Sequence, residues 1–310
     1  MTPPIRIGII GYGKIARDQH IPAIQASQDF QLAAISDPKP SDDAEAPFFQ
    51  DYADMLAAQI VDAVAICTPP APRHGIALAC LETGYPLLLE KPPTVTLGEM
   101  AGLAQTASRC SKTLFTTWHA QYNTAVEEAR VRIAQDGLSR ARITWIEDVR
   151  KWHPGQDWIW KPGGFGVFDP GINALSLASL LFPGPLTVSK AELDYPSNSD
   201  TPIAAILSLM TTDHVPIEVI LNWRTEGEER WEIDIVSRTG SNLKLQKGGS
   251  ELKIDGSPVV QHGIGEYPAI YQRFAHLLRS GQSHVDVEPL RLVADAFLLQ
   301  HRRTSEAFQG

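Results

Sequence analysis

The segment formed by residues 11–16, Gly-Tyr-Gly-Lys-Ile-Ala, has small residues at a spacing that brings backbone amides close to a phosphate. A short apolar run precedes it and a helical pattern follows it. Gly11 permits the tight turn, and Gly13 permits close backbone approach. The new helix presents unpaired N–H groups and the positive end of its dipole. We therefore expect a pyrophosphate to bind here, next to Lys14 and Ile15.

An acidic residue, Asp37, closes the second apolar run of the chain. A carboxylate at this point can accept hydrogen bonds from both ribose hydroxyls of NAD and repels the 2′-phosphate of NADP. The nearby Lys39 offsets part of that repulsion. The sequence thus predicts NAD as the preferred cofactor and NADP as a weaker one. A simple turn role for Asp37, directly before Pro38, remains the alternative.

Polar residues also follow the third and fourth apolar runs. Because open parallel sheets bind ligands beyond the carboxyl ends of their strands, we expect these residues to line the cofactor groove. They are Thr68, Pro69, His74, Glu90 and Lys91. An ordinary solvated lysine at a strand end is the alternative for Lys91.

Asp169 and Asn173 are four residues apart. If this segment is helical, both side chains lie on one face, where a carboxylate and a carboxamide can meet one hydroxyl group. The carboxylate would accept a proton, and the carboxamide would orient the hydroxyl. The alternative is that Asp169 caps a helix that starts at Pro170.

The segment that contains Trp152, His153, Trp158 and Trp160 is unusually aromatic. A sugar has an apolar C–H face on which an indole can stack, while polar neighbours such as His153 bind its hydroxyls. We expect a sugar-binding group with these further members: His119, Glu147 and Trp231. Core packing remains the alternative for His119 and for each tryptophan.

The first 120 residues alternate short apolar runs with helical patterns, which predicts a parallel sheet covered on both faces, a Rossmann domain. The expected strands are 5–10, 31–36, 61–67, 87–89 and 113–117. The expected helices are 14–26, which Pro22 interrupts, 76–83 and 97–108.

Residues 121–310 have a different pattern, with consecutive strands separated by turn signals. This predicts an α+β domain on a largely antiparallel open sheet. The expected strands are 141–149, 188–195, 203–211, 217–223, 231–236 and 242–246, and the expected helices are 126–134, 267–278 and 290–300. Because an open sheet leaves one face uncovered, we expect a homodimer through this sheet.

Composition limits the remaining possibilities. The 310 residues carry a net charge of −9, which argues against a protein that coats nucleic acid. The three cysteines form no CxxC pair, so we expect neither a metal site nor disulfides. No signal-peptide pattern and no long apolar stretch occurs, so we expect a cytoplasmic protein without membrane partners.

Five segments together resemble the Gfo/Idh/MocA family of pyranose- and inositol-type oxidoreductases, over essentially the whole chain. They are residues 11–16, 16–23, 90–92, 147–155 and 163–173. The last two are similar to the members that oxidise D-galactose or L-arabinose at C1. The resemblance implies NAD-dependent oxidation of a cyclic aldose to its lactone, with D-galactose preferred. The alternatives are L-arabinose oxidation with NAD(P) and galactose secondary, and a non-catalytic sugar or NAD sensor.

The resemblance also implies roles for individual residues. Asp169 would act as the general base, Lys91 would polarise the sugar O1, and Asn173 would orient the sugar. Many family members have histidine where this chain has Asn173. This departure leaves Asp169 and Lys91 as the main proton-handling candidates, and which of them takes the proton stays open.

Overall fold

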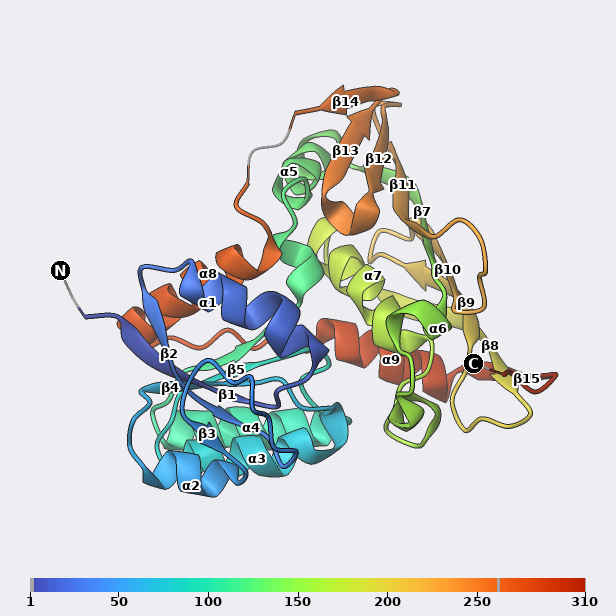
Figure 1. Cartoon of the computed structure of the whole chain (residues 1–310). Helices are drawn as coiled ribbons and strands as arrows, with labels where there is room; N and C mark the ends of the chain where they lie inside the picture. Colours follow the sequence, from blue (N-terminus) through green and yellow to red (C-terminus); the bar gives the residue numbers. More distant parts are fainter. Residues whose placement is uncertain (1–2, 261–262, 310) are drawn as a thin grey trace. The chain divides into compact units, whose positions relative to one another are not determined.

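The computed structural model describes residues 3–260 and 263–309 and divides into two compact units (Figure 1). The first unit contains the chain up to His119 and also Gly265–Val287. The second contains Ala120–Ile264 and the chain from Glu288 onward. The predicted division after residue 120 therefore differs from the structure at Gly265–Val287, where the chain returns to the first unit. The reason is a strongly amphipathic helix, α8 (Glu266–Ser280), whose buried aromatic and aliphatic side chains belong to the first core.

The first unit is built on six parallel strands in the order β3-β2-β1-β4-β5-β6. This confirms the predicted Rossmann sheet. The strand order reverses between β1 and β4, the position beside which open α/β sheets bind ligands. The strands are β1 (Ile5–Ile10), β2 (Phe30–Ser36), β3 (Phe48–Phe49), β4 (Ala63–Ile66), β5 (Leu87–Leu89) and β6 (Leu114–Thr116).

Helices cover both faces of this sheet, with α1 and α8 on one side and α2, α3 and α4 on the other (Figure 1). Besides α8 they are η1 (Ala16–His20), α1 (Ile21–Gln25), α2 (Tyr52–Ala57), α3 (Pro70–Glu82) and α4 (Leu97–Arg109). Element η1 is a π-helical turn that leads into α1. Pro22 lacks an N–H and its ring crowds the carbonyl four residues earlier, which accounts for a π-helical turn at this point.

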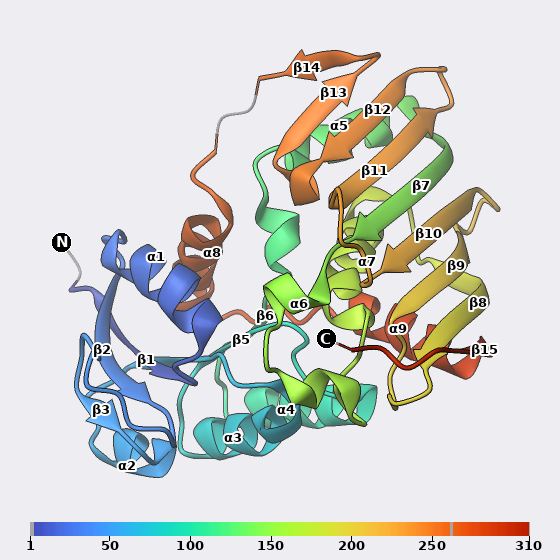
Figure 2. The same ribbon diagram turned by 45° about the vertical axis from the view of Figure 1, so that its right-hand side comes forward.

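The second unit contains a nine-stranded sheet in the order β14-β13-β12-β11-β7-β10-β9-β8-β15 (Figure 2). Only the pairs β7/β10 and β8/β15 are parallel, so the predicted, largely antiparallel sheet is confirmed. The strands are β7 (Leu138–Ile146), β8 (Thr187–Pro196), β9 (Ala204–Met210), β10 (Pro216–Asn222), β11 (Arg230–Ser237), β12 (Asn242–Gln246), β13 (Glu251–Ile254), β14 (Ser257–Val259) and β15 (Gln300–Ser305).

Helices α5, α7 and α9 lie on one face of that sheet (Figure 2). The helical elements are η2 (His119–Tyr122), α5 (Val126–Asp136), α6 (Val149–Trp152), η3 (Asp157–Trp160), α7 (Phe168–Leu181), η4 (Lys247–Gly249) and α9 (Glu288–Leu298). Helix α7 is buried almost all round, which is typical of a central helix. A Cβ at Gly171 would lie 2.5 Å from Leu221, so glycine permits the close packing of α7 on β10.

Candidate active site

The glycine turn after β1 has the shape that close phosphate approach requires. Gly11 has a φ of +96°, and a Cβ there would lie 2.7 Å from the backbone nitrogen of Thr68. A Cβ on Gly13 would meet no described atom within 4 Å, so protein packing does not demand glycine there. The small residue instead keeps backbone accessible at the start of the helix, where Lys14 is exposed and Ile15 half-buried.

The carboxylate of Asp37 is fixed in orientation by backbone. It accepts one hydrogen bond from the N–H of Tyr12 at 2.8 Å and one from the N–H of Lys39 at 2.9 Å. Each carboxylate oxygen has a further lone pair that a hydroxyl can use. The residue thus lies at the end of β2 with its acceptors preorganised, as the dinucleotide fingerprint requires.

The end of β4 provides a second observation that fits a bound cofactor. The hydroxyl oxygen of Thr68 is buried and has no hydrogen-bond partner among the described residues. Pro69 is the N-cap of α3, and His74 is half-buried in the first turns of that helix. Since buried polar atoms are normally satisfied, the Thr68 hydroxyl is suited to a ligand at the glycine turn.

Glu90 is almost fully buried, at 3% exposure, and has three partners in the first unit. Its Oε1 lies 3.0 Å from His20 Nε2 and accepts the hydroxyl of Tyr267 at 2.8 Å. Its Oε2 accepts the N–H of Lys91 at 2.9 Å. The side chain therefore holds the backbone that carries Lys91, and the expected contact of Glu90 with the cofactor stays a prediction. Lys91 itself is half-buried and precedes a cis peptide to Pro92.

Charge stabilises the contact between His20 and Glu90. Burial by itself would raise the pKa of Glu90, but hydrogen bonds and charge from His20 and Tyr267 hold that pKa well below its ordinary value. Burial by itself would lower the pKa of His20, but its neighbours, Cys67 and Glu90 among them, hold it well above the ordinary value. The pair is thus a buried ion pair over a wide pH range.

Three members of this network were not predicted as site residues: His20, Tyr267 and Arg73. Arg73 is 2% exposed, and its guanidinium donates to the backbone carbonyls of Thr68, Glu90 and Pro92. It ties the end of β4 to the loop after β5. Arg73 precedes the expected helix 76–83, and its acceptors are backbone atoms that no sequence pattern reveals.

His119 was expected to bind sugar, and in the first unit it contacts α8. Its Nδ1 lies 3.3 Å from Glu266, and its ring stacks on Tyr267 with 6.0 Å between centroids. Burial lowers the pKa of His119, but the charge and hydrogen bond of Glu266 outweigh burial and raise it. The sugar-binding role of His119 stays a prediction.

The remaining sugar-binding candidates all belong to the second unit. Glu147 follows β7 and is 7% exposed. Its Oε1 accepts the indole N–H of Trp223 at 2.9 Å, and its Oε2 accepts that of Trp231 at 2.8 Å. Two indole donors therefore hold the carboxylate. Trp223, one of these donors, is fully buried.

The aromatic segment packs around the same carboxylate. Trp152 on α6 contacts Trp231 edge to face, with 5.8 Å between centroids, and is 38% exposed. His153 contacts Trp223 in the same manner at 5.0 Å. Trp160 contacts Trp223 from another side at 5.6 Å. The predicted residues thus form one cluster with Trp223 at its centre.

Asp169 and Asn173 lie on the first turns of α7 and are 3% and 8% exposed. The helix starts at Phe168 after the N-cap Val167, so the alternative that Asp169 is the N-cap is wrong. Asp169 Oδ2 lies 3.5 Å from Nε2 of His153. The carboxamide oxygen of Asn173 is buried without a hydrogen-bond partner among the described residues, which suits a ligand hydroxyl.

Comparisons with known proteins identify the family of this chain. The profile of the Gfo/Idh/MocA family, described as an oxidoreductase family with an NAD-binding Rossmann fold, matches residues 5–117. The galactose 1-dehydrogenase of Pseudomonas fluorescens is 43% identical over 310 residues, which cover 98% of this chain and 99% of that protein. The chain belongs to the Gfo/Idh/MocA family. The resemblance expected from the sequence is confirmed.

Comparison with solved structures extends the match to the whole fold. The D-galactose-1-dehydrogenase of Rhizobium etli is 41% identical, with a TM-score of 0.93, and the match covers 100% of this chain and 99% of that one. A 3-ketoreductase from Actinomadura kijaniata shares the fold with a TM-score of 0.84 at 16% identity, covering 97% of this chain and 99% of that one. As a Gfo/Idh/MocA protein, the chain is an oxidoreductase with a Rossmann domain of the NAD-binding type.

The described residues contain neither a metal-binding cluster nor a membrane-spanning helix. Within residues 3–260 and 263–309, no group of three or more His, Cys, Asp or Glu side chains is arranged to hold a metal ion. In the same ranges, no helix has both the length and the apolar character needed to cross a membrane.

Proposed function

We propose that this chain oxidises the cyclic form of D-galactose at C1 to D-galactono-lactone, with NAD as the hydride acceptor. The observation that carries the proposal is the 43% identity to a galactose 1-dehydrogenase along both units of the chain. The reaction breaks the C1–H and O1–H bonds, and the C1–H electron pair leaves as hydride. The cofactor accepts that hydride, so the protein's own residues have to bind the sugar and remove the proton.

Proton removal is assigned to Asp169. The residue is buried at the start of α7, where a carboxylate can be held against one hydroxyl, and Asn173 follows one turn later on the same face. The unsatisfied Asn173 oxygen would accept a sugar hydroxyl. For Lys91 the proposal keeps the role that the family resemblance implies, polarisation of O1.

Sugar recognition is assigned to the cluster around Trp223. Glu147 is held by two indoles and keeps lone pairs for sugar hydroxyls. The partly exposed Trp152 offers a ring face for the C–H surface of a pyranose. His153 and Trp231 complete the group that we propose for the second unit, and His119 is the candidate from the first.

The decisive experiment is a panel of aldoses with purified protein, following NADH absorbance. We expect the highest kcat/KM with D-galactose, lower values with L-arabinose, and turnover of D-fucose, which lacks only the 6-hydroxyl. A higher kcat/KM with L-arabinose would mean that L-arabinose, and not D-galactose, is the main substrate. No turnover of any aldose, combined with binding of sugar or NAD by calorimetry, would support the sensor alternative.

Cofactor choice is assigned to Asp37. Its carboxylate, held by two backbone N–H groups, would accept the ribose hydroxyls and repel a 2′-phosphate. We expect a lower KM for NAD than for NADP, and Asp37→Ser should raise the NADP/NAD ratio of kcat/KM by about tenfold, roughly 1.4 kcal/mol. An unmodified protein with equal or lower KM for NADP would contradict this assignment.

A homodimer through the nine-stranded sheet remains part of the proposal. Side chains on β9 alternate between buried and more exposed, and Ile206 on the outer side is 47% exposed. Apolar surface of this kind is suited to contact with a second copy. Light scattering at micromolar concentration should give about twice the 34.0 kDa chain mass, and a monomer would contradict the proposal.

A further inference from the structure

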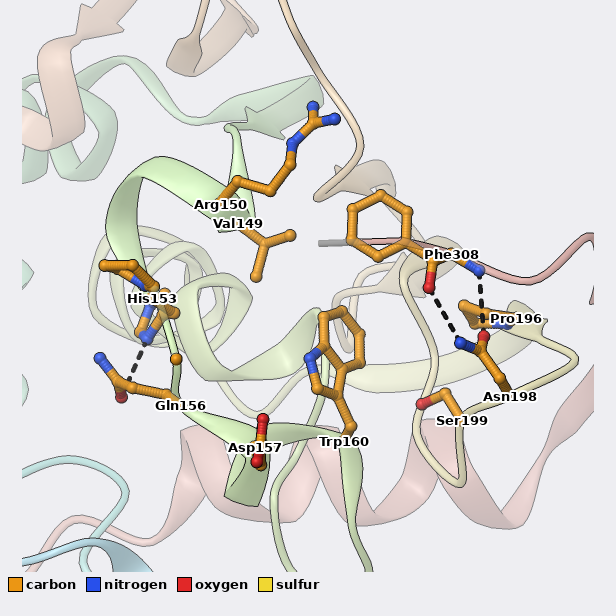
Figure 3. A pocket seen from close by; sticks show the side chains of 12 residues that line it. Val149, Arg150, His153, Gln156, Asp157, Trp160, Pro196, Asn198, Ser199 and Phe308 are labelled. Atoms are coloured by element: carbon orange, nitrogen blue, oxygen red, sulfur yellow. Dashed lines mark hydrogen bonds between the residues drawn. The ribbon is translucent and has the colours of Figure 1, made fainter.

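The imidazole of His153 lies between a buried carboxylate and a cavity. On one side its Nε2 is 3.5 Å from Oδ2 of Asp169, and on the other its Nδ1 is 3.4 Å from Oε1 of Gln156. The side chain of His153 is 18% exposed and that of Asp169 is 4% exposed. Figure 3 shows His153 and Gln156 together at the rim of the cavity. An imidazole in this position links an interior acid to a space that water can enter.

The hydrogen bonds around Gln156 indicate which nitrogen of His153 carries a proton. Trp158 donates its indole N–H to Oε1 of Gln156 at 3.1 Å, and an indole N–H can only donate. The amide is therefore oriented with its oxygen toward both rings. Because an amide oxygen accepts, Nδ1 of His153 must be the donor in its contact with Gln156. Nε2, the nitrogen that faces Asp169, is then the one that can accept a proton.

The cavity next to His153 has a volume of about 430 Å³. A water molecule occupies about 30 Å³ in the liquid, so the space can hold a chain of several waters. Its polar lining residues are Arg150, Gln156, Asp157, Asn198 and Ser199. This lining can hydrogen-bond such waters and lead a proton away from the imidazole.

Charged groups approach His153 from three elements of the second unit. Asp169 comes from α7, Arg150 from α6 and Asp157 from η3, while the Trp223 ring covers another side at 5.0 Å. Arg150 is already paired with Asp148 at 2.8 Å. An anion, the Asp169 carboxylate, thus lies 3.5 Å from Nε2, which favours the protonated imidazole as a transient state.

We propose that His153 is a proton relay for Asp169, a role that rests on the proposed sugar oxidation. The O1–H bond of the sugar breaks as the proton moves to Asp169. It then moves to Nε2 of His153, which restores the carboxylate, while Nδ1 releases its proton to water in the cavity, which leaves a neutral imidazole. Proton exchange with water between turnovers restores the Nδ1–H form and its hydrogen bond to Gln156. The 3.5 Å separation has to shorten during turnover, as catalytic contacts commonly do when substrate binds.

The relay also accounts for the departure at position 173. The family resemblance places an imidazole four residues after the aspartate in many relatives, and this chain has Asn173 there. The structure supplies an imidazole to the same aspartate from a different segment, the loop after α6. The titratable ring is thus relocated rather than lost.

The test compares His153→Ala with the unmodified protein at saturating galactose and NAD. General acid–base groups commonly contribute 10²–10⁴-fold, and we expect kcat to fall by about 10²-fold. Added imidazole should restore part of the activity, and restoration by a series of methylated imidazoles should increase with their basicity. Because a merely space-filling role would show no dependence on basicity, this dependence separates the relay from packing.

Two further variants make the outcome decisive. Gln156→Leu removes the acceptor for Nδ1–H and should lower kcat several-fold while the galactose KM stays unchanged. His301→Ala, an exposed histidine on β15, serves as the control and should retain full activity. If His153→Ala does not fold, His153→Gln takes its place, since it keeps a polar amide but accepts no proton.

The possible failures are distinguishable. An unmodified protein that turns over no aldose refutes the proposed function. Normal turnover by the unmodified protein, together with unchanged kcat in the His153 variants, refutes the relay alone. Loss of kcat that imidazoles restore irrespective of their basicity also refutes the relay and assigns His153 to packing.

Discussion

Two carboxylates, Glu90 in the first unit and Asp169 in the second, are both 3% exposed and both face a histidine, yet their surroundings differ. Glu90 has close contacts from His20, Tyr267 and the Lys91 backbone at 2.8–3.0 Å. Asp169 faces His153 at 3.5 Å, beside a cavity. Burial alone therefore does not identify a catalytic acid. The two histidines also differ, because His20 is fully buried whereas His153 lines a cavity, and this access to water is what our proposal uses to distinguish the two carboxylates.

The largest effect should come from Asp169→Ala. If Asp169 takes the sugar proton, kcat should fall by about 10²–10⁴-fold, because that is the usual contribution of a general base. Affinity for NAD, measured by fluorescence titration, should be unchanged. Near-normal turnover would refute the role of Asp169 as the base. Asp169 would then have a structural role, as Glu90 does.

Glu90→Gln should act mainly on stability. Removing one partner of a buried ion pair leaves the other charge uncompensated and commonly costs about 3–5 kcal/mol. Denaturant unfolding should show a loss of this size in the first unit, whereas Asp169→Asn should show much less. The exposed Glu82→Gln is a matched control. Equal stability losses for Glu90→Gln and Asp169→Asn would contradict the comparison.

The stabilisation by the Glu90–His20 pair should depend on pH. The pKa of His20 is raised on folding, so its contribution is complete below its ordinary value of 6.5 and is lost as pH rises through the raised value. The pKa of Glu90 is lowered, so its contribution is complete above 4.5 and is lost as pH falls through the lowered value. The difference in Tm between the unmodified protein and Glu90→Gln should be largest between pH 4.5 and 6.5. A difference that stays constant at all pH values would show that no ion pair exists.

The smallest effect should come from Trp231→Phe, which removes one of the two indole donors to Glu147. Loss of a hydrogen bond of about 1 kcal/mol corresponds to a change of about fivefold. We expect the galactose KM to rise by about this factor with kcat unchanged. Tyr195→Phe removes a hydroxyl contact to Gln300 elsewhere in the second unit and should leave KM unchanged. An unchanged KM in Trp231→Phe would place Glu147 outside the sugar site.

Elements with a strong local pattern were predictable from the sequence. Strands β1, β5 and β12 have the expected bounds, because the apolar runs of β1 and β5 and the apolar–polar alternation of β12 end at clear turn signals. Helix α7 was expected only conditionally, since continuous burial removes the apolar periodicity. Strand β15 was not expected, because its six residues are polar and its pairing with β8 is a tertiary contact.

The sequence by itself determined the glycine turn, the acid after β2 and the family, because each depends on residues close together in the chain or on similarity along it. It also singled out Glu90, Glu147, His153 and Asp169. Only the tertiary structure decided which donors surround these side chains. Tyr267 is 177 residues from Glu90, and Trp231 is 84 residues from Glu147. Such distant donors hold each carboxylate in place, and no local pattern encodes them.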